Sequence, residues 1–315
     1  MQNRQLGTSS LEVSPLCFGC NVFGWTADEE MSFRLLDGWL DAGFNFYDTA
    51  DVYSRWHDGN EGGESETIMG KWLASRGGRD KIVLATKFGM DMGDSKVGLS
   101  PEYMVRAVED SLRRLQTDYI DLYQSHKDDE NTPVDATLEA YAKLIEQGKV
   151  REIGASNFSA TRMKEALDAS ETKGLPRYQS LQPLYSLVER DTFEGDLEDL
   201  CAAENVGVIG FYSLASGFLT GKYRSKADME GRIRAPRVEK YVTEDGFRVL
   251  DALDAVAKKH NAKMGQVALA WLMARPSVTS PIASATNMDQ LVELTATVAL
   301  SLDADDIAKI DEASK

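Results

Sequence analysis

The chain of 315 residues carries 35 Lys and Arg against 51 Asp and Glu. Its formal net charge of −16 disfavours a general partner of nucleic acid or of anionic membranes. The 43% hydrophobic and 27% charged residues are typical of a soluble globular protein, and no apolar run approaches the roughly 18 residues of a membrane-spanning helix. The N-terminal segment MQNRQLGTSSLEVSP lacks the apolar core of a secretory signal, so we expect a cytoplasmic protein.

Short β-branched or aromatic runs alternate with amphipathic helical segments almost from end to end, which is typical of repeated βα units. The predicted strands are residues 13–20, 44–50, 82–88, 119–126, 150–156, 180–185, 206–213 and 279–284. The helices predicted after them are residues 28–42, 64–77, 101–115, 133–147, 159–174, 195–205, 244–260 and 287–299. Ser100-Pro101-Glu102, Thr132-Pro133 and Ser159 stand where helix caps or first-turn residues are expected.

Eight such units predict an α/β fold of the closed (β/α)8 or TIM-barrel type, since right-handed crossovers place each strand beside its predecessor. One domain over residues 1–315 accounts for all of them. Two segments are additional: a helical stretch at 263–275 and a long loop at 216–242, after the seventh strand. The rival Rossmann sheet lacks its G-x-G-x-x-G motif, and residues 217–222 are one residue short of a P-loop.

Polar residues follow three consecutive predicted strands, at the end of a barrel where active sites lie. Asp48 ends the second strand with Tyr53 in the loop beyond, Lys87 ends the third strand, and His126 ends the fourth. Neighbouring strands run about 4.8 Å apart, so we expect these four side chains to converge on one catalytic site. Taken singly, each also fits a solvated charge or a packed ring.

The four residue types make chemical sense together. A phenol with a pKa near 10 is a poor acid or base at pH 7. An ammonium about 4 Å away contributes roughly 4 kcal/mol at an effective dielectric near 20, before the opposing cost of desolvation is counted, so we expect Lys87 to adjust the pKa of Tyr53. A buried Lys87 needs a counter-charge to stay protonated, and Asp48 is placed to supply it.

Four segments carry a family resemblance: GFNFYDTADVY (43–53), ATKFG (85–89), LRRLQTDYIDLYQSH (112–126) and GASNFS (154–159). They are similar to the signatures of the aldo-keto reductases, and the resemblance covers nearly the whole chain. It implies an NAD(P)H-dependent carbonyl reductase on a (β/α)8 barrel, with a small carbonyl or alcohol substrate. Tyr53 is then the acid, Lys87 its tuner, Asp48 its support and His126 the residue that orients the substrate.

The resemblance also assigns cofactor contacts. Ser156, Asn157 and Gln182 match the positions that hold the nicotinamide carboxamide, and Tyr212 matches the aromatic residue that stacks on its ring. The segment GFYSLASGFLTGKY (210–223) is similar to the stretch that holds the pyrophosphate. The remaining residues expected around the cofactor are Gly19, Cys20, Asn21, Asp48, Ser213, Leu214, Gly217, Leu219, Lys222, Arg232, Ser284, Thr286, Gln290 and Glu293. Helix caps and a flexible glycine loop are the alternatives for these positions.

The adenosine end departs from the family pattern. Ser284-Ala285-Thr286 stands where many relatives have Gly-Ala-Arg, so the Arg that grips the 2′-phosphate is missing. Residues 222–240 hold seven Lys and Arg against three acids, and these cations either replace that Arg or form a solvated charge run. We expect NADP(H) to be favoured, with NAD(H) as the alternative.

Aromatic residues in the loops suggest an apolar substrate pocket, although each also fits packing under a loop. The expected lining is Phe23, Trp25, Tyr53, Trp56, Phe88, Met90, His126 and Tyr185. Cys17 and Cys20 form a C-x-x-C within a predicted strand, where residues three apart point to opposite faces, so packed thiols are favoured over a redox or metal pair. We expect no metal site.

Two other functions stay open. Some relatives are regulatory beta subunits of voltage-gated potassium channels; they carry Asn where this chain has His126, and an extended N-terminal segment that is lacking here. Barrel aldolases form a Schiff base on a strand-end Lys, for which Lys87 is the candidate.

Overall fold

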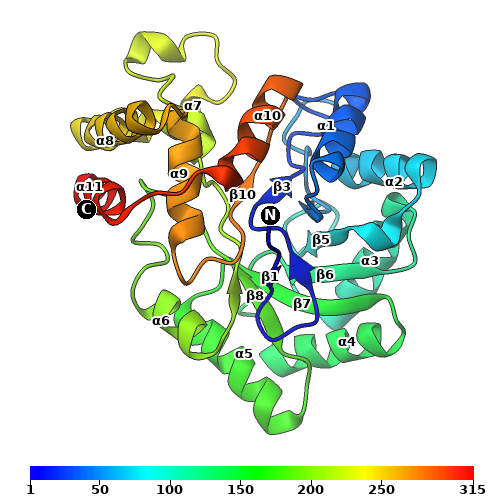
Figure 1. Cartoon of the computed structure of the whole chain (residues 1–315). Coiled ribbons are helices and arrows are strands. Elements are labelled where there is room, and N and C mark those ends of the chain that lie inside the picture. The colour runs from blue at the N-terminus through cyan, green and yellow to red at the C-terminus, as the bar shows by residue number, and fades with distance from the viewer.

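A computed structural model describes residues 1–315, apart from the side chain of Lys226. Its main sheet has eight parallel strands in the order β10-β3-β4-β5-β6-β7-β8-β9 (Figure 1). The strands are β3 (Cys17–Gly19), β4 (Phe46–Asp48), β5 (Val83–Phe88), β6 (Ile120–Ser125), β7 (Val150–Ser156), β8 (Tyr178–Gln182), β9 (Gly207–Val208) and β10 (Ile282–Ala283). The sheet closes where the Ile282 N–H donates to the Gly210 carbonyl, beside a bridge between Val208 and Val278. The predicted (β/α)8 barrel is confirmed.

Helices alternate with the strands and surround them in Figure 1. Those after β3 to β8 are α1 (Glu29–Asp41), α2 (Glu64–Arg76), α3 (Pro101–Leu115), α4 (Val134–Glu146), α5 (Ala160–Lys173) and α6 (Asp196–Ala203). After β9 come α7 (Ala235–Val238), α8 (Glu244–His260) and α9 (Met264–Ala274), and after β10 come α10 (Met288–Ala296) and α11 (Ala304–Ala313). Short 3-10 helices are η1 (Arg79–Lys81), η2 (Ala215–Thr220), η3 (Lys226–Met229), η4 (Glu239–Tyr241) and η5 (Thr297–Ala299).

Two helix caps form as predicted and one does not. The Ser100 and Ser159 side chains accept hydrogen bonds from the Tyr103 and Arg162 amides at the starts of α3 and α5. Pro133 occupies the cap position of α4, while the Thr132 hydroxyl donates to Asp129 instead. The pair Thr132-Pro133 therefore marks the start of α4 as predicted, but the cap position falls on Pro133, because the Thr132 hydroxyl is used within its own turn.

The predicted first strand is divided in two. Residues Glu12–Val13 (β2) pair antiparallel with Arg4–Gln5 (β1), and only Cys17–Gly19 (β3) joins the barrel. Pro15 separates them, since proline has no N–H to continue a ladder. The hairpin lies in front of the barrel strands in Figure 1. The strands predicted at 206–213 and 279–284 also pair over fewer residues than expected, and α11 was not predicted.

The hairpin fills one end of the barrel with apolar side chains. Leu6, Leu11 and Val13 share a buried cluster with Phe46 and Val83 from the first residues of β4 and β5. A larger cluster lies between the sheet and the helices. The strand interiors at the hairpin end are therefore apolar, and polar groups are left for the opposite, carboxyl end.

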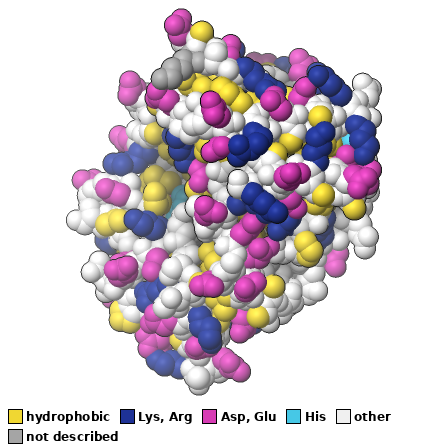
Figure 2. Space-filling model, turned by 90° about the vertical axis from the view of Figure 1, so that its left-hand side faces the viewer, with side chains coloured by type: hydrophobic (Ala, Val, Ile, Leu, Met, Phe, Trp, Pro, Cys, Tyr) yellow, Lys and Arg dark blue, Asp and Glu magenta, His cyan; other side chains and the backbone are white. Residues whose placement is uncertain are grey.

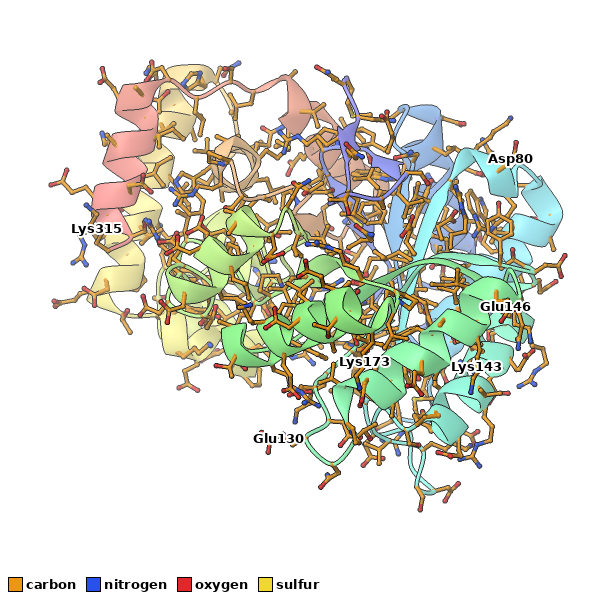
Figure 3. The ribbon with its side chains drawn as sticks, turned by 90° about the horizontal axis from the view of Figure 1, so that it is seen from below. Asp80, Glu130, Lys143, Glu146, Lys173 and Lys315 are labelled. Carbon is orange, nitrogen blue, oxygen red and sulfur yellow. The ribbon has the colours of Figure 1, made fainter. Side chains whose placement is uncertain are left out.

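The outer helices carry the charge. Figure 3 shows Lys143 and Glu146 on α4 and Lys173 on α5, and all three are exposed. On the face drawn in Figure 2, Lys and Arg are interspersed with Asp and Glu around smaller hydrophobic areas. None of the helices formed by the described residues is long and apolar enough to cross a membrane.

Candidate active site

The carboxyl ends of β4 and β5 bring Asp48, Lys87 and Tyr53 into contact. Lys87 Nζ lies 2.7 Å from Asp48 Oδ2 and 2.7 Å from the Tyr53 hydroxyl oxygen. The Tyr53 hydroxyl donates to Asp48 Oδ2 over 3.1 Å. Three predicted residues therefore form a closed triangle of a carboxylate, an ammonium and a phenol.

Lys87 and Asp48 form a fully enclosed ion pair, with 0% and 1% of their side chains exposed. The third acceptor for Lys87 is the Thr49 carbonyl at 2.8 Å, so all three ammonium protons have partners. Asp48 Oδ1 accepts from Gln182 Nε2 at 2.9 Å and from Gln124 Nε2 at 3.2 Å. Full pairing is what makes such buried charges tolerable.

Gln124 is a site residue that the sequence analysis missed. It pairs in register with Lys87 and stands two residues before His126 on β6, so strand alternation already placed it on the inner face. Gly154 on β7 leaves it room, because a Cβ there would lie 3.1 Å from Gln124 Cγ and 2.3 Å from Ser180 Oγ. The two-residue alternation of the strand, counted back from His126, would have identified Gln124.

The surroundings of Tyr53 raise its pKa, whereas the Lys87 ammonium alone would lower it. Burial raises the pKa of the Tyr53 phenol well above 10, and the nearby Asp48 carboxylate raises that pKa further. Desolvation, which the expectation for Lys87 left aside, and the Asp48 carboxylate therefore outweigh the ammonium of Lys87. The resting phenol holds its proton firmly.

His126 stands beside this triangle, with its ring centroid 6.0 Å from that of Tyr53. Burial, and then the Lys87 ammonium, lower the pKa of His126 well below 6.5, so the imidazole is neutral. Its Nδ1 is buried and has no hydrogen-bond partner among the described residues. A neutral imidazole with an unused ring nitrogen is suited to hydrogen-bonding a ligand.

The three residues predicted to hold a carboxamide lie next to one another at the ends of β7 and β8. Asn157 has a left-handed φ of 56°, and its Nδ2 donates to Ser156 Oγ and to the His126 carbonyl. Ser156 Oγ donates to the Gln182 carbonyl. The Gln182 amide nitrogen points to Asp48, so this residue joins the predicted cofactor edge to the triangle.

The segment after β9 is a strained turn. Tyr212, Ala215, Ser216 and Gly217 all have positive φ, of 60°, 47°, 57° and 92°. Left-handed conformations cost of order 1 to 3 kcal/mol for residues other than glycine and gather at functional sites. Lys222 folds back onto Gly217, where a Cβ would lie 2.9 Å from Lys222 Nζ. The backbone here approaches a cation closely, as expected for a turn that holds an anion.

Some predicted cofactor residues are occupied within the protein. Leu219 and Cys20 are 0% exposed and their side chains pack in the core, so any contact with a cofactor is left to their backbone atoms. Leu214 is half-buried against the same core, and the Ser213 hydroxyl donates to the Gly210 carbonyl. Both follow from the tight turn that these residues form.

The predicted adenosine end gathers around β3 and β10. Ser284 Oγ donates to Asn21 Oδ1 over 2.8 Å, beside Gly19, whose Cβ position is 2.7 Å from the same hydroxyl. The Thr286 amide and hydroxyl both donate to Gln290 Oε1, so Gln290 closes the start of α10. Glu293 is exposed one turn later. These side chains are adjacent, but Thr286 and Gln290 already satisfy each other.

The loop predicted at 216–242 is partly ordered by η2, η3, α7 and η4, and its part at 222–242 lies at the top of Figure 1. Lys222 and Arg232 both approach the Tyr223 ring, with their charged groups 5.2 Å and 5.8 Å from its centre. Burial lowers the pKa of Lys222, and the like charges of Arg234 and Arg232 lower that pKa further. The described part of this cluster forms no ion pair between Lys222 or Arg232 and an acid. Lys222 and Arg232 thus form a cluster of cationic side chains without a protein counter-charge.

Only some of the residues expected to line an aromatic pocket lie beside Tyr53. Trp56 meets Tyr53 edge to face, with ring centroids 5.9 Å apart, and Trp25 meets Trp56 at 5.7 Å. Met90 is half-buried. The other three expected lining residues, Phe23, Phe88 and Tyr185, are 0% exposed and belong to the core between sheet and helices.

Strand alternation explains one of these errors. Lys87 points into the barrel, so Phe88 must point outward, where it stacks on Tyr123. Tyr185 is held outside by its hydrogen bond to Glu194, and Phe23 by stacking on Phe18.

The described residues contain no group of three or more His, Cys, Asp or Glu arranged to hold a metal ion. Cys17 and Cys20 are both buried and unbonded, and burial raises the pKa of each thiol well above its ordinary value. They are packed thiols, as the alternation of the strand indicates.

Comparisons with known proteins agree with this geometry. A family model described as the Aldo/keto reductase family matches residues 15–315. The chain is 37% identical to the uncharacterized oxidoreductase YrpG of Bacillus subtilis (strain 168), over 99% of this chain and 95% of that protein. It is 34% identical to a probable voltage-gated potassium channel subunit beta of Oryza sativa subsp. japonica (93% and 90%), and 31% identical to the L-glyceraldehyde 3-phosphate reductase of Escherichia coli O157:H7 (99% and 92%).

Proposed function

Because the chain belongs to the aldo/keto reductase family, we propose that it reduces an aldehyde or ketone to an alcohol with NAD(P)H, Tyr53 acting as the general acid. The observation that carries this proposal is the Tyr53 hydroxyl, which contacts both Lys87 and Asp48 at the strand ends of the barrel. Reduction of a carbonyl needs a hydride at carbon and a proton at oxygen. A bound NAD(P)H supplies the hydride, and the chain must supply the proton.

Each of the four residues has a role that its contacts support. Tyr53 holds a proton at its hydroxyl and gives it to the carbonyl oxygen. His126, neutral and with an unused ring nitrogen, hydrogen-bonds that oxygen and orients it. Lys87 stabilises the phenolate that Tyr53 becomes, and Asp48 provides the counter-charge that keeps the fully buried Lys87 protonated.

The residues around the barrel mouth fit a nicotinamide nucleotide. Ser156, Asn157 and Gln182 are the proposed contacts for the carboxamide, and Tyr212 for the ring. The strained turn and Lys222 would bind the phosphates, since backbone N–H groups and a cation without a protein counter-charge are what phosphates require. Gly19, Asn21, Asp48, Ser284, Thr286, Gln290 and Glu293 complete the proposed contacts.

We favour NADP(H) over NAD(H). The 2′-phosphate carries nearly two charges, and Lys222 and Arg232 form a cluster that lacks a protein counter-charge within the described residues. Thr286 contributes little to this preference, because its hydroxyl already donates to Gln290.

Tyr53→Phe tests the proposal, with Tyr119→Phe as the matched control. The first variant deletes the transferable proton and keeps the ring, so kcat for reduction of an aldehyde panel, followed at 340 nm, should fall at least about a hundredfold while cofactor binding persists. Tyr119 lies beside the start of β6, at the opposite end of the barrel, and its variant should keep full activity. A loss below tenfold in Tyr53→Phe would remove Tyr53 from the role of acid.

The Schiff-base alternative fits the contacts of Lys87 less well. A lysine that attacks a carbonyl must be neutral and accessible, whereas Lys87 is fully buried and donates three hydrogen bonds. Borohydride treatment with an aldehyde should therefore leave no covalent adduct on Lys87. A regulatory role like that named for the rice relative would be supported by binding to a channel without any turnover of carbonyl compounds.

A further inference from the structure

Two arginines of the 222–242 segment lie over the aromatic wall beside Tyr53. The Cζ atoms of Arg234 and Arg237 are both 5.7 Å from the centre of the Trp25 ring. Arg237 Cζ is also 5.8 Å from the centre of the Trp56 ring. Guanidinium groups at this distance from an indole face are attracted to it and held in place.

Neither guanidinium is neutralised by the protein. In the described part of the chain, Arg234 and Arg237 take part in no ion pair, although most arginines of the outer helices do. Arg237 Nη1 donates to the Tyr212 hydroxyl over 3.3 Å, which is a neutral partner. Burial and the neighbouring Arg237 charge lower the pKa of Arg234. Two adjacent cationic side chains without an acidic partner can bind an anion.

The position of this charge relative to Tyr53 restricts what the anion belongs to. Trp56 contacts both groups, since its ring centre is 5.9 Å from that of Tyr53 and 5.8 Å from Arg237 Cζ. A molecule lying along Trp56 can therefore present its carbonyl to Tyr53 and a distant anionic group to Arg237. The cations assigned to the cofactor phosphates, Lys222 and Arg232, surround Tyr223 instead.

We propose that Arg237, with Arg234 behind it, selects carbonyl substrates that carry an anionic group, a carboxylate or a phosphate, at the far end of an apolar or aromatic body. The inference rests on the proposed reductase function and adds a specificity determinant to it. Trp25 and Trp56 bind the body, and the guanidinium binds the anion by charge-assisted hydrogen bonds, for which its planar fork is suited.

The test compares three aldehydes that differ only in the group para to the carbonyl: 4-carboxybenzaldehyde, 4-formylphenyl phosphate and 4-methylbenzaldehyde. In the unchanged protein, kcat/KM for at least one of the anionic aldehydes should exceed that for the methyl compound by about tenfold or more. Arg237→Leu should abolish this preference through KM, and Arg237→Lys should retain most of it. Comparing carboxylate with phosphate shows which anion the site prefers.

Two controls separate this role from others. Arg224→Leu removes a cation of the same segment that is paired with Asp251, and it should leave the ratio unchanged. NADPH affinity, titrated by fluorescence, should change less than about twofold in Arg237→Leu, because Arg237 touches the proposed cofactor site only through the Tyr212 hydroxyl, and the ring of Tyr212 stays in place.

Two results would overturn the inference. An unchanged ratio in Arg237→Leu would do so, and so would a loss of NADPH affinity with the ratio preserved, because Arg237 would then serve the cofactor. If the unchanged protein reduces 4-methylbenzaldehyde while either result holds, only this inference fails. If it reduces none of the three aldehydes, the proposed function fails as well.

Discussion

The Asp48–Lys87 pair allows a quantitative prediction. The two charges lie 2.7 Å apart with almost no exposure, and at an effective dielectric near 20 their attraction is about 6 kcal/mol. Desolvation offsets much of that energy, so the net value of the pair is small. Removing one partner is different, because the other charge then stays buried and unpaired, at a cost of about 3 to 5 kcal/mol.

We therefore expect Lys87→Met and Asp48→Asn each to destabilise the protein by about 3 to 5 kcal/mol, and the double variant by less than either single variant. Urea unfolding followed by tryptophan fluorescence measures all four proteins of the cycle. Lys164→Met, which breaks an exposed pair with Asp168 on α5, is the control and should be nearly neutral. Additive losses in the double variant would refute the reasoning, since they would mean that the two charges do not stabilise each other.

Three further predictions follow from the same contacts. Burial and Lys87 lower the pKa of His126 well below 6.5, so near pH 6 only the unfolded chain binds a proton there. The free energy of unfolding should therefore fall as the pH drops below about 6.5. His126→Asn should lessen this fall, measured by urea unfolding at pH 7 and pH 5. Asp306→Ala should lower the thermal midpoint by a few degrees and speed proteolysis of α11, because its carboxylate caps that helix and pairs with two basic side chains of α8, whereas exposed Asp305→Ala should not. Thr286→Arg should tighten NADPH by roughly 1 to 3 kcal/mol in calorimetric titrations and leave NADH unchanged; equal affinities would mean that residue 286 is remote from the 2′-phosphate.

The barrel and the convergence of the catalytic candidates were predictable from the sequence. Eight strand-and-helix units admit few topologies, and the closed barrel places the carboxyl ends of consecutive strands at one edge. Once Asp48, Lys87 and His126 end neighbouring strands, their proximity follows from the spacing of the sheet. Tyr53 could be placed near them because it follows Asp48 by five residues, but its role as the acid came from the family signature, since it lies in a loop whose path no periodicity fixes.

Which aromatic side chains pack in the core could not be predicted from the sequence in the same way. Phe23, Phe88 and Tyr185 are as suitable for a pocket wall as Trp25 and Trp56, and only the structure shows which face each ring takes. The helix α11 was missed because its apolar residues are few. Its start is instead fixed by a capping box between Asp303 and Asp306, whose acids resemble an ordinary charged tail in the sequence.

The state of Tyr53 depends on which of two opposing electrostatic effects is larger. The sequence shows a nearby ammonium, which favours the phenolate, but not the depth of burial or the second contact to Asp48, which both favour the neutral phenol. A neutral phenol is the form required of a proton donor, so this buried environment suits the proposed acid better than a lowered pKa would. Lys87 then acts when the proton leaves, because its ammonium already lies 2.7 Å from the oxygen that becomes negative. The same contact that fails to lower the resting pKa of Tyr53 thus stabilises the product of the proton transfer.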